Sequence, residues 1–348
     1  MTSLGIGYAG AMRPISFTTS TAASVSTSSQ VPIIECPREL RPAALRKLHD
    51  ALPSDQRLVM TQVLEQLDPA DEGAWAGLLI AGGDGVVWVQ RAAGNMAVVW
   101  ATPEVGEVPA ALLRAAAAFV DAHGIPLAQM VVGERDGYSN EQNDRGGFPR
   151  FAALQYLFAE VSPLSDARDL SDDPVTQACV VEQRDALQFV PRAGDEPLRL
   201  GELLEQTYIG TLDCPGLDGI RPMGDVLEGY RRQGRHAPDD WYFVQQNGVD
   251  VGALLLAEHP GFGNWELVYM GVISAARGQK HGDAIIRFAL EVAARRSAER
   301  LVLAVDEVNA PALCAYERAG FVTWDRRLVY ARLRTPSQHS ANVALPQL

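Results

Sequence analysis

The chain repeats itself once, at a fixed offset of 173 residues. That offset pairs a helical stretch, a strand-like run and a Gly-Phe dipeptide: 111–114 with 284–287, 130–132 with 303–305, and Gly147-Phe148 with Gly320-Phe321. One ungapped offset that aligns three kinds of element is hard to obtain by chance, and self-similarity of this kind marks repeated structural units. The 348 residues are therefore expected to hold two copies of one domain.

The second copy contains a strand–helix–strand pattern. Residues 265–273 are rich in β-formers, and a turn at Arg277–Gly282 leads into a helix. The apolar face of this helix carries Ala284, Ile285, Phe288, Ala289, Val292 and Ala293. Residues 301–305 form an unbroken apolar run, which suits a strand covered on both faces. The pattern predicts an α/β fold with a mixed sheet, and it makes the turn before the helix a candidate anion site.

Composition narrows the possible functions. The net charge of −13 argues against nucleic-acid binding as the main activity. The four cysteines (Cys36, Cys179, Cys214 and Cys314) lack metal-site spacing, which favours reduced thiols and no metal. No apolar run approaches the about 20 residues that cross a bilayer. We expect a cytoplasmic protein with neither nucleic-acid nor membrane partners; its oligomeric state stays open.

Composition also suggests domain limits. Residues 1–30 are rich in Ser, Thr, Gly and Ala and are expected to form a disordered tail. The first copy is assigned to residues 31–163 and the second to 177–335. A polar segment, 164–176, has linker composition, and residues 336–348 form a second tail.

The two copies differ at the candidate anion site. Shifted back by 173 residues, Arg277–Gly282 falls on Glu104-Val105-Gly106-Glu107-Val108-Pro109. This stretch carries two acids and a proline that lacks an N–H group, so it would repel a bound dianion. Tyr316 likewise falls on Asn143. The first copy is interpreted as degenerate: it keeps the fold without the chemistry.

Residues of about 175–335 resemble the GNAT superfamily of N-acetyltransferases. The duplication is similar to tandem-domain members such as mycothiol synthase. The turn Arg277–Gly282 resembles the family motif Gln/Arg-x-x-Gly-x-Gly/Ala. Asn309 precedes the last helix, and Tyr316 lies in the run Ala315–Phe321, where the family has Leu-Tyr-x-x-x-Gly-Phe. The turn motif is weak alone, but together with the Asn, the Tyr and the strand–helix order it is specific.

The resemblance implies acetyl-CoA as co-substrate. The turn residues Arg277, Gly278, Gln279, Lys280, His281 and Gly282 would hold its pyrophosphate. The strand around Met270 and Val272 would splay from its neighbour and expose a backbone N–H to the thioester carbonyl. Asn309 is expected to cap the last helix and to contact the pantetheine arm. Tyr316 would be the general acid that protonates the CoA thiolate, the alternative being a core tyrosine.

Lys280 departs from the family pattern, which has glycine at this position. A lysine in right-handed helical geometry keeps its N–H available, and its ammonium could pair with a phosphate. It could also fold over the site and weaken cofactor binding.

Glu266 is the expected general base, because it lies in the strand that would face the cofactor. Period-2 alternation places it on one face with Val268 and Met270. A solvated strand glutamate is the alternative interpretation, and Asp306 is a second candidate base. Asp213 lies in the Gly/Pro-rich segment Thr207–Pro222, which shapes the acceptor pocket in the family, and could bind a cationic amine.

Two functions remain open at this point. The first is an acetyl-CoA-dependent N-acetyltransferase that acts on a primary amine by direct attack, its acceptor being a small molecule or a peptide. The second is a non-catalytic acyl-CoA-binding or scaffold protein of the same fold. His259 and His281 have no partner at ligand spacing and are not expected to bind metal.

Overall fold

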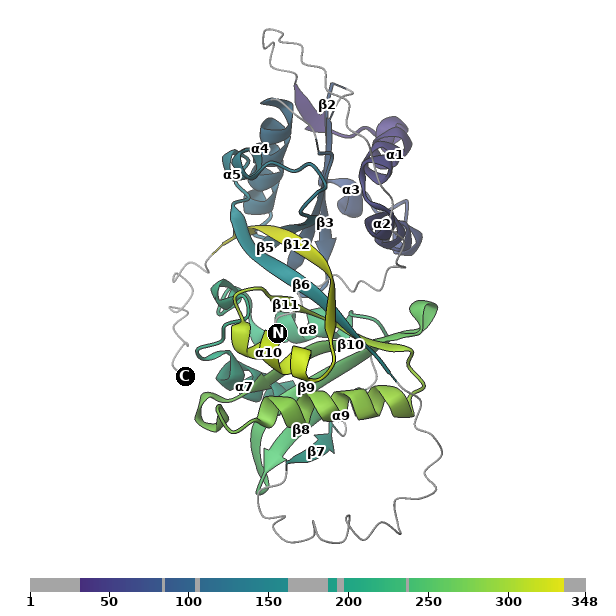
Figure 1. Ribbon diagram of the computed structural model, residues 1–348. Coiled ribbons are helices and arrows are strands. Elements are labelled where there is room, and N and C mark those ends of the chain that lie inside the picture. The colour runs from purple at the N-terminus through teal and green to yellow at the C-terminus, as the bar shows by residue number, and fades with distance from the viewer. Residues whose placement is uncertain are drawn as a thin grey trace, which may run out of the picture.

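The computed structural model describes residues 32–82, 85–103, 107–161, 187–192, 197–235 and 238–334. The predicted tails and linker, and residues 104–106 of the degenerate turn, lie outside these ranges. All described strands form one 12-stranded sheet with the order β1-β2-β3-β4-β5-β12-β6-β11-β10-β9-β8-β7 (Figure 1). The predicted mixed α/β architecture is confirmed, since the sheet has parallel and antiparallel pairs and helices on its faces.

The first half of the chain supplies the strands of one end of the sheet. Its elements are β1 (Ile33–Glu35), α1 (Arg41–Ala51), α2 (Ser54–Gln66), α3 (Glu72–Trp75), β2 (Leu78–Ala81), β3 (Gly85–Ala92), β4 (Met96–Ala101), α4 (Glu107–Ala122), β5 (Leu127–Gly133), α5 (Asn140–Arg145) and β6 (Arg150–Glu160). The second half continues with β7 (Gln188–Pro191), α7 (Pro197–Tyr208), α8 (Met223–Arg231), β8 (Trp241–Gln246), β9 (Val249–His259), β10 (Asn264–Val272), α9 (His281–Arg295), β11 (Arg300–Asp306), α10 (Ala310–Arg318) and β12 (Val322–Leu333).

The elements of the two halves follow the 173-residue offset. Shifted by that offset, β5 falls on β11 residue for residue, and α4 begins one residue before α9. Strand β6 likewise begins one residue inside β12 and ends with it. From α4 onward the repeat seen in the sequence is thus a repeat of structure.

The last strands of the two halves are exchanged. Strand β6 pairs antiparallel with β11 of the second half, and β12 pairs antiparallel with β5 of the first half. The two exchanged strands also pair with each other at the centre of the sheet. In Figure 1, β6 runs down into the second half and β12 runs up into the first. Each half of the sheet is therefore completed by the last strand of the other half of the chain.

The exchanged strands contribute to the core of the half that receives them. Leu157 and Ala159 of β6 are buried in the core of the second half. Leu328 and Tyr330 of β12 are buried in the core of the first half. Two such strands bind the halves more firmly than a surface contact would, because separating the halves breaks strand pairing and both cores together.

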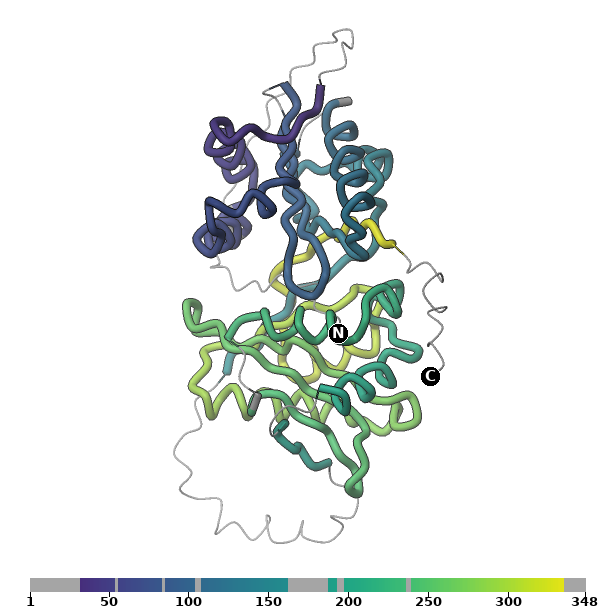
Figure 2. Tube along the Cα trace, turned by 180° about the vertical axis from the view of Figure 1, so that it is seen from behind, coloured from purple at the N-terminus to yellow at the C-terminus, as the bar shows by residue number. Residues whose placement is uncertain are grey.

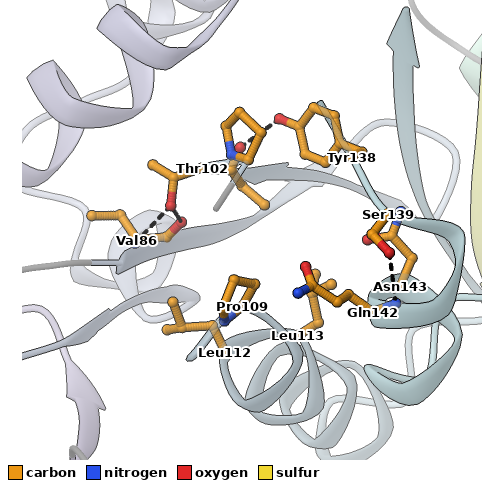
Figure 3. A pocket seen from close by; sticks show the side chains of 11 residues that line it. Val86, Thr102, Pro109, Leu112, Leu113, Tyr138, Ser139, Gln142 and Asn143 are labelled. Carbon is orange, nitrogen blue, oxygen red and sulfur yellow. Dashed lines mark hydrogen bonds between the residues drawn. The ribbon is translucent and has the colours of Figure 1, made fainter. Parts of the chain in front are cut away.

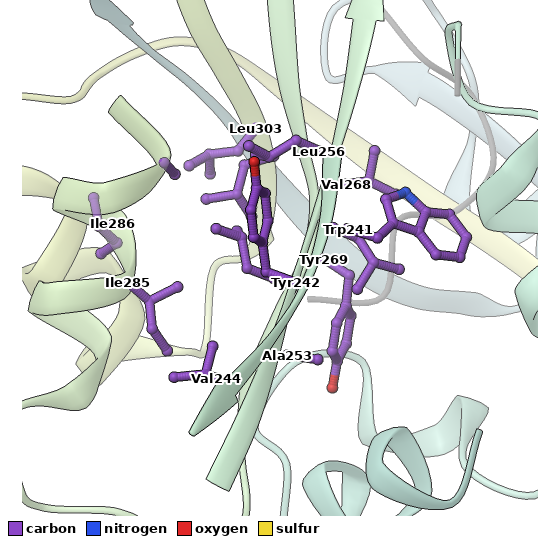
Figure 4. Close-up of a cluster of buried hydrophobic side chains, with 14 of the residues drawn as sticks. Trp241, Tyr242, Val244, Ala253, Leu256, Val268, Tyr269, Ile285, Ile286 and Leu303 are labelled. Atoms are coloured by element: carbon purple, nitrogen blue, oxygen red, sulfur yellow. The ribbon is translucent and has the colours of Figure 1, made fainter. Parts of the chain in front are cut away.

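The sheet of the second half is covered on both faces. Helix α9 faces the viewer in Figure 1, and α7 and α8 lie on the opposite side, which faces the viewer in Figure 2. Figure 4 shows Ile285 and Ile286 of α9 on one side of the strands, with Trp241 and Tyr269 on the other. Burial on both faces agrees with the continuous apolar runs of these strands.

Candidate active site

Strands β10 and β11 part in the middle of the sheet. Their parallel pairing covers Asn264↔Arg300 to Glu266↔Val302, while β10 continues to Val272 and β11 to Asp306. The splay that the family resemblance implied is therefore present. Beyond Glu266, the backbone of β10 is no longer part of the ladder with β11.

A cleft of about 550 Å³ opens beside this gap. Its walls are the end of α7 with the following loop, the splayed part of β10, the turn before α9, and the start of α10. The lining residues are Thr207, Gly210, Thr211, Leu212, Tyr269, Met270, Gly271, Val272, Ala276, Arg277, Gly278, Lys280, His281, Gly282, Asp283, Asn309, Pro311, Ala312, Ala315 and Arg318. Eight of the predicted cofactor-binding residues thus line one cleft; the ninth, Gln279, is exposed and is not among them.

The turn before α9 uses two left-handed residues. Gly278 has φ +80° and Lys280, the N-cap, has φ +61°. The expected right-handed geometry of Lys280 is thus wrong. A glycine is favoured at this position because a Cβ in the left-handed region costs about 1–2 kcal/mol. Lys280 lines the cleft, and the free N–H groups of the first turn of α9 lie next to it.

Basic side chains surround this helix end. Asp283, in the first turn of α9, would repel an anion, but its Oδ1 accepts a hydrogen bond from Arg318 Nη2 at 2.7 Å. Lys280 and Arg318 both border the cleft. With Asp283 paired, the helix end presents a positive environment suited to a phosphate.

Arg277 has a structural task. Its guanidinium donates to the backbone carbonyls of Thr207 (2.7 Å), Gly210 (2.9 Å) and Val272 (3.1 Å). It therefore fastens the end of α7 to the end of β10 across the cleft. Arg277 also lines the cleft, and the cofactor contact predicted for it stays a prediction.

Asn309 and His281 both line the cleft. The Asn309 side chain caps α10 by accepting a hydrogen bond from the Ala312 N–H at 3.3 Å, which confirms its predicted capping role. His281 is 8% exposed, and its Nε2 has no hydrogen-bond partner among the described residues.

Tyr316 and Asp213 lie behind the cleft wall. Tyr316 is 1% exposed, packs edge-on against Phe321 and is not a lining residue. Burial, and then the charge of Asp213, raises the pKa of Tyr316 well above its ordinary value of 10. Asp213 is 3% exposed, and its Oδ1 accepts the Asp306 N–H at 2.8 Å. The prediction that Asp213 could bind the acceptor is therefore wrong: Asp213 does not line the cleft, and its carboxylate holds the backbone at the end of β11.

A β-bulge corrects the expected face of Glu266. Opposite β9, Glu266 pairs with Ala257, Leu267 with Leu256 and Tyr269 with Leu255, so that Val268 is an extra residue. Glu266 consequently shares its face with Tyr269 and not with Met270. The predicted grouping of Glu266 with Met270 was wrong because one inserted residue reverses the alternation beyond it.

Glu266 forms a buried pair with His259. The carboxylate Oε2 lies 2.8 Å from His259 Nε2, and both side chains are close to nine-tenths buried. Burial alone lowers the pKa of His259, but the hydrogen bond and charge of Glu266 outweigh it and raise the pKa above 6.5. Glu266 does not line the cleft, and its role as the base stays a prediction.

Two hydroxyl groups in the cleft wall escaped the sequence analysis. Thr207, at the end of α7, and Tyr269, after the bulge of β10, are hydrogen-bonded to each other and both line the cleft. Thr207 was noted only as the start of a Gly/Pro-rich segment. The sequence did not indicate a role for Tyr269, because the face of β10 on which its side chain lies depends on a bulge that the sequence does not show.

The first half supports the loop between α7 and α8 from outside. Arg221 Nη1 donates to the Gly94 carbonyl, in the turn between β3 and β4, at 2.8 Å. The Phe151 ring of β6 packs on Gly216, where a methyl group would lie 2.7 Å from Cε2. No residue of the first half is among those that line the cleft. The first half thus braces this loop.

The equivalent site in the first half is nearly closed. A cavity of only about 10 Å³ lies there, and several of its lining residues correspond to cleft residues at the 173-residue offset (Figure 3). Pro109 stands where the second half has Gly282, and Tyr138 where it has Pro311. Tyr138 bridges the space by donating from its hydroxyl to the Ala101 carbonyl at 2.6 Å. Such a cavity holds about one water molecule, so the described residues there leave no room for a cofactor arm.

Known proteins match the second half. Residues 206–321 match the model of the acetyltransferase (GNAT) family. Mycothiol acetyltransferases of Corynebacterium glutamicum and Corynebacterium efficiens are each 34% identical over 67 residues, which is 19% of this chain and 23% of theirs. The match thus spans about a quarter of the length of these relatives.

No described helix is long and apolar enough to cross a membrane.

A solved structure shares the architecture of almost the whole chain. The GCN5-related N-acetyltransferase from Sphaerobacter thermophilus superimposes with a TM-score of 0.55 at 15% identity, covering 88% of this chain and 98% of that one. At this identity the likeness concerns the fold. The family match, the splayed strands and the turn before α9 lead to one conclusion: residues 206–321 form a GNAT acetyltransferase domain.

Proposed function

We propose that the second half is an N-acetyltransferase that moves the acetyl group of acetyl-CoA to a primary amine by direct attack. The observation that carries this proposal is the continuity of the cleft. One space joins the N-terminus of α9, which suits a pyrophosphate, to the gap between β10 and β11, which suits a thioester.

The residues present fit acetyl-CoA. The backbone N–H groups from Gly278 to Gly282 would bind the pyrophosphate, with Lys280 supplying positive charge while Arg318 offsets the charge of Asp283. Asn309 lines the cleft and would border the pantetheine arm. Met270 and Val272 would flank the thioester on the open edge of β10.

The reaction then needs three events at the gap. The amine lone pair forms a bond to the thioester carbon, a backbone N–H near Val272 stabilises the oxyanion, and the C–S bond breaks to release CoA thiolate. The thiolate gains one proton and the amine loses one. Glu266, on the same face of β10 as Tyr269 and Gly271, is the proposed final acceptor of the amine proton, through water.

The alternative is an acyl-CoA-binding protein without catalysis. It is favoured by the position of Tyr316, which is buried outside the lining of the cleft. If Tyr316 is the general acid, the helix α10 must present it to the cleft when acetyl-CoA binds. The substitution Tyr316→Phe tests this role: loss of turnover with unchanged acetyl-CoA affinity supports the acid, and unchanged turnover removes it.

A binding experiment tests the cofactor site first. Acetyl-CoA and CoA should raise the melting temperature of the protein in a saturable way, and NADH should not. The variant Gly282→Pro removes an N–H at the second position of α9, where proline is sterically tolerated, and should abolish the shift. Gly224→Pro is the matched control, because Gly224 holds the second position of α8 and its Cβ position is open. An equal loss in both variants would contradict the assignment.

Turnover separates the two functions. Release of CoA from acetyl-CoA is measured with ethanolamine, spermidine and triglycine as amine probes. Amine-dependent CoA release supports the transferase. Saturable acetyl-CoA binding with no release above the rate without amine supports the binding protein. The curated relatives are named acetyltransferases, which supports transfer but leaves the acceptor of this chain to the experiment.

A further inference from the structure

The acceptor-side wall of the cleft contains an ordered pair of hydroxyl groups. Thr207 and Tyr269 are 3% and 2% exposed, and both line the cleft. Their hydroxyl oxygens are hydrogen-bonded to each other. The Thr207 hydroxyl also donates to the Leu204 carbonyl, one turn back in α7, at 2.7 Å.

The number of hydroxyl protons fixes the direction of these two hydrogen bonds. A threonine hydroxyl has one proton, and Thr207 gives it to Leu204. The proton between Thr207 and Tyr269 must therefore come from Tyr269. Both hydroxyl protons are then used, and the Tyr269 oxygen keeps lone pairs that can only accept. No other partner for this oxygen occurs among the described residues.

Tyr269 stays a neutral hydroxyl in this setting. Burial, and then the neighbouring Tyr208, raises the pKa of Tyr269 well above 10. It cannot therefore act as a base at neutral pH. It offers a fixed, neutral hydrogen-bond acceptor.

The hydroxyl stands at the reacting end of the cleft. A methyl group added at Gly271 would collide with the Tyr269 hydroxyl and lie 2.9 Å from Thr207 Cβ. Gly271 belongs to the part of β10 that has left β11, next to Val272. The backbone acceptors in the same wall, the carbonyls of Thr207 and Gly210, are already occupied by Arg277.

We propose that Tyr269 Oη accepts an N–H hydrogen bond from the acceptor amine and so orients its lone pair toward the thioester. The substrate class is an uncharged primary amine at the moment of attack. The inference rests on the proposed transferase function and assigns one residue of its acceptor site.

The test compares two tyrosine variants of the full-length protein. Tyr269→Phe removes the acceptor oxygen. Tyr230→Phe removes a hydroxyl of the same aromatic cluster that bonds to Tyr208 at 2.8 Å and does not line the cleft. Each is assayed for acetyl-CoA affinity by calorimetry and for CoA release across a concentration series of the amine, among ethanolamine, spermidine and triglycine, that the wild type uses best.

We expect Tyr269→Phe to lower kcat/KM for the amine about tenfold, as for one lost hydrogen bond, with acetyl-CoA affinity within about twofold of wild type. Tyr230→Phe should leave both unchanged. Thr207→Ser keeps the hydroxyl chain and should retain activity, whereas Thr207→Val frees the Tyr269 proton and should lower it.

Each other outcome overturns the proposal in a recognisable way. Wild-type kcat/KM in Tyr269→Phe, or an equal loss in Tyr230→Phe, refutes the role of Tyr269 and leaves the transferase intact. A matching loss of acetyl-CoA affinity would assign the hydroxyl to the cofactor. A wild type that binds acetyl-CoA but transfers to none of the probes contradicts the transferase itself, and the proposal is then rejected with it.

Discussion

At the residue scale, the departures from the family pattern have local physical costs. Lys280 adopts a left-handed conformation that glycine adopts without strain, and it does so at the helix end proposed to bind phosphate. The charge of the lysine and the strain of its backbone act on different quantities, so two substitutions separate them.

Lys280→Gly should raise the free energy of unfolding by about 0.5–1 kcal/mol, because it relieves the left-handed Cβ. Lys280→Ala keeps the Cβ and should not stabilise. Both variants lose the ammonium and should bind acetyl-CoA more weakly by a similar factor. Urea unfolding and calorimetry measure the two effects; a stabilised Lys280→Ala would refute the strain argument.

The buried pair of Glu266 and His259 should make stability depend on pH. The folded-state pKa of His259 lies above its ordinary value of 6.5, so the pair stabilises fully below about pH 6.5 and less as pH rises through the folded-state value. Near pH 6, the free energy of unfolding of the wild type should exceed that of Glu266→Gln by about 2 kcal/mol. The difference should shrink at higher pH, as measured by urea unfolding in a pH series. A difference that grows with pH would contradict the assignment.

The sequence predicted the residues of the cofactor turn because chemistry and spacing coincide in one short segment. It failed for Glu266 and Asp213 for two different reasons. The face of Glu266 depends on the bulge at Val268, which no residue type marks. Asp213 lies in a Gly/Pro-rich segment and was expected to bind the acceptor amine, but its carboxylate is buried and accepts the Asp306 N–H.

At the element scale, Arg277 connects the two walls of the cleft. It holds the last turn of α7, the following loop and the end of β10 by three backbone carbonyls. A cation at the C-terminal end of α7 is also favoured by the helix dipole. The cleft therefore depends on this residue for its width.

Arg277→Met should lower the melting temperature and increase hydrogen exchange of residues 204–212, while exchange in α9 stays unchanged. The expected loss is about 2 kcal/mol, because the variant leaves carbonyls without their charged donor. Arg277→Lys keeps the charge but not the planar fork, so it should recover only part of the loss. If exchange rises equally in α9, the effect is global unfolding and not release of one wall.

Gly271→Ala tests the position of the hydroxyl pair from the β10 side of the cleft. The added methyl would displace the paired hydroxyls of Tyr269 and Thr207. Turnover with the amine probe should fall at least as far as in Tyr269→Phe, since the hydroxyl is moved away from the acceptor. Gly261→Ala, in a site with open space, is the matched control. Unchanged turnover in Gly271→Ala would contradict the position assigned to the hydroxyl pair.

Most element types were predictable, because periodicity and turn residues agree along the chain. The strand predicted at 265–273, the helix after the turn Arg277–Gly282 and the strand predicted at 301–305 are confirmed as β10, α9 and β11, and the offset of the repeat carries β5 onto β11. The residue pattern of a single element does not predict which strands become neighbours in the sheet. Strands β6 and β12 occupy equivalent places in the two halves, and nothing in their residues marks which half each one joins.

At the scale of the whole molecule, the exchange of β6 and β12 decides what the first half does. It has no open cofactor site among its described residues, yet it supplies the strand that pairs with β11. It also holds the loop between α7 and α8 through Arg221 and Phe151. The first half is thus part of the structural support of the second half, and the predicted boundary at residue 163 cuts between a strand and its partners.

A protein truncated to residues 164–348 should therefore fail to fold. It lacks β6, so Leu157 and Ala159 are missing from its core, and β11 and β12 each lose a paired neighbour. Exposed, unpaired strand edges promote aggregation. Co-expression of residues 1–163 with 164–348 should restore a soluble complex that copurifies and binds acetyl-CoA, because the exchanged strands can pair between chains as they do within one. A soluble, fully active 164–348 fragment on its own would mean that β12 can fold back beside β11, and that the exchange is dispensable for the acetyltransferase domain.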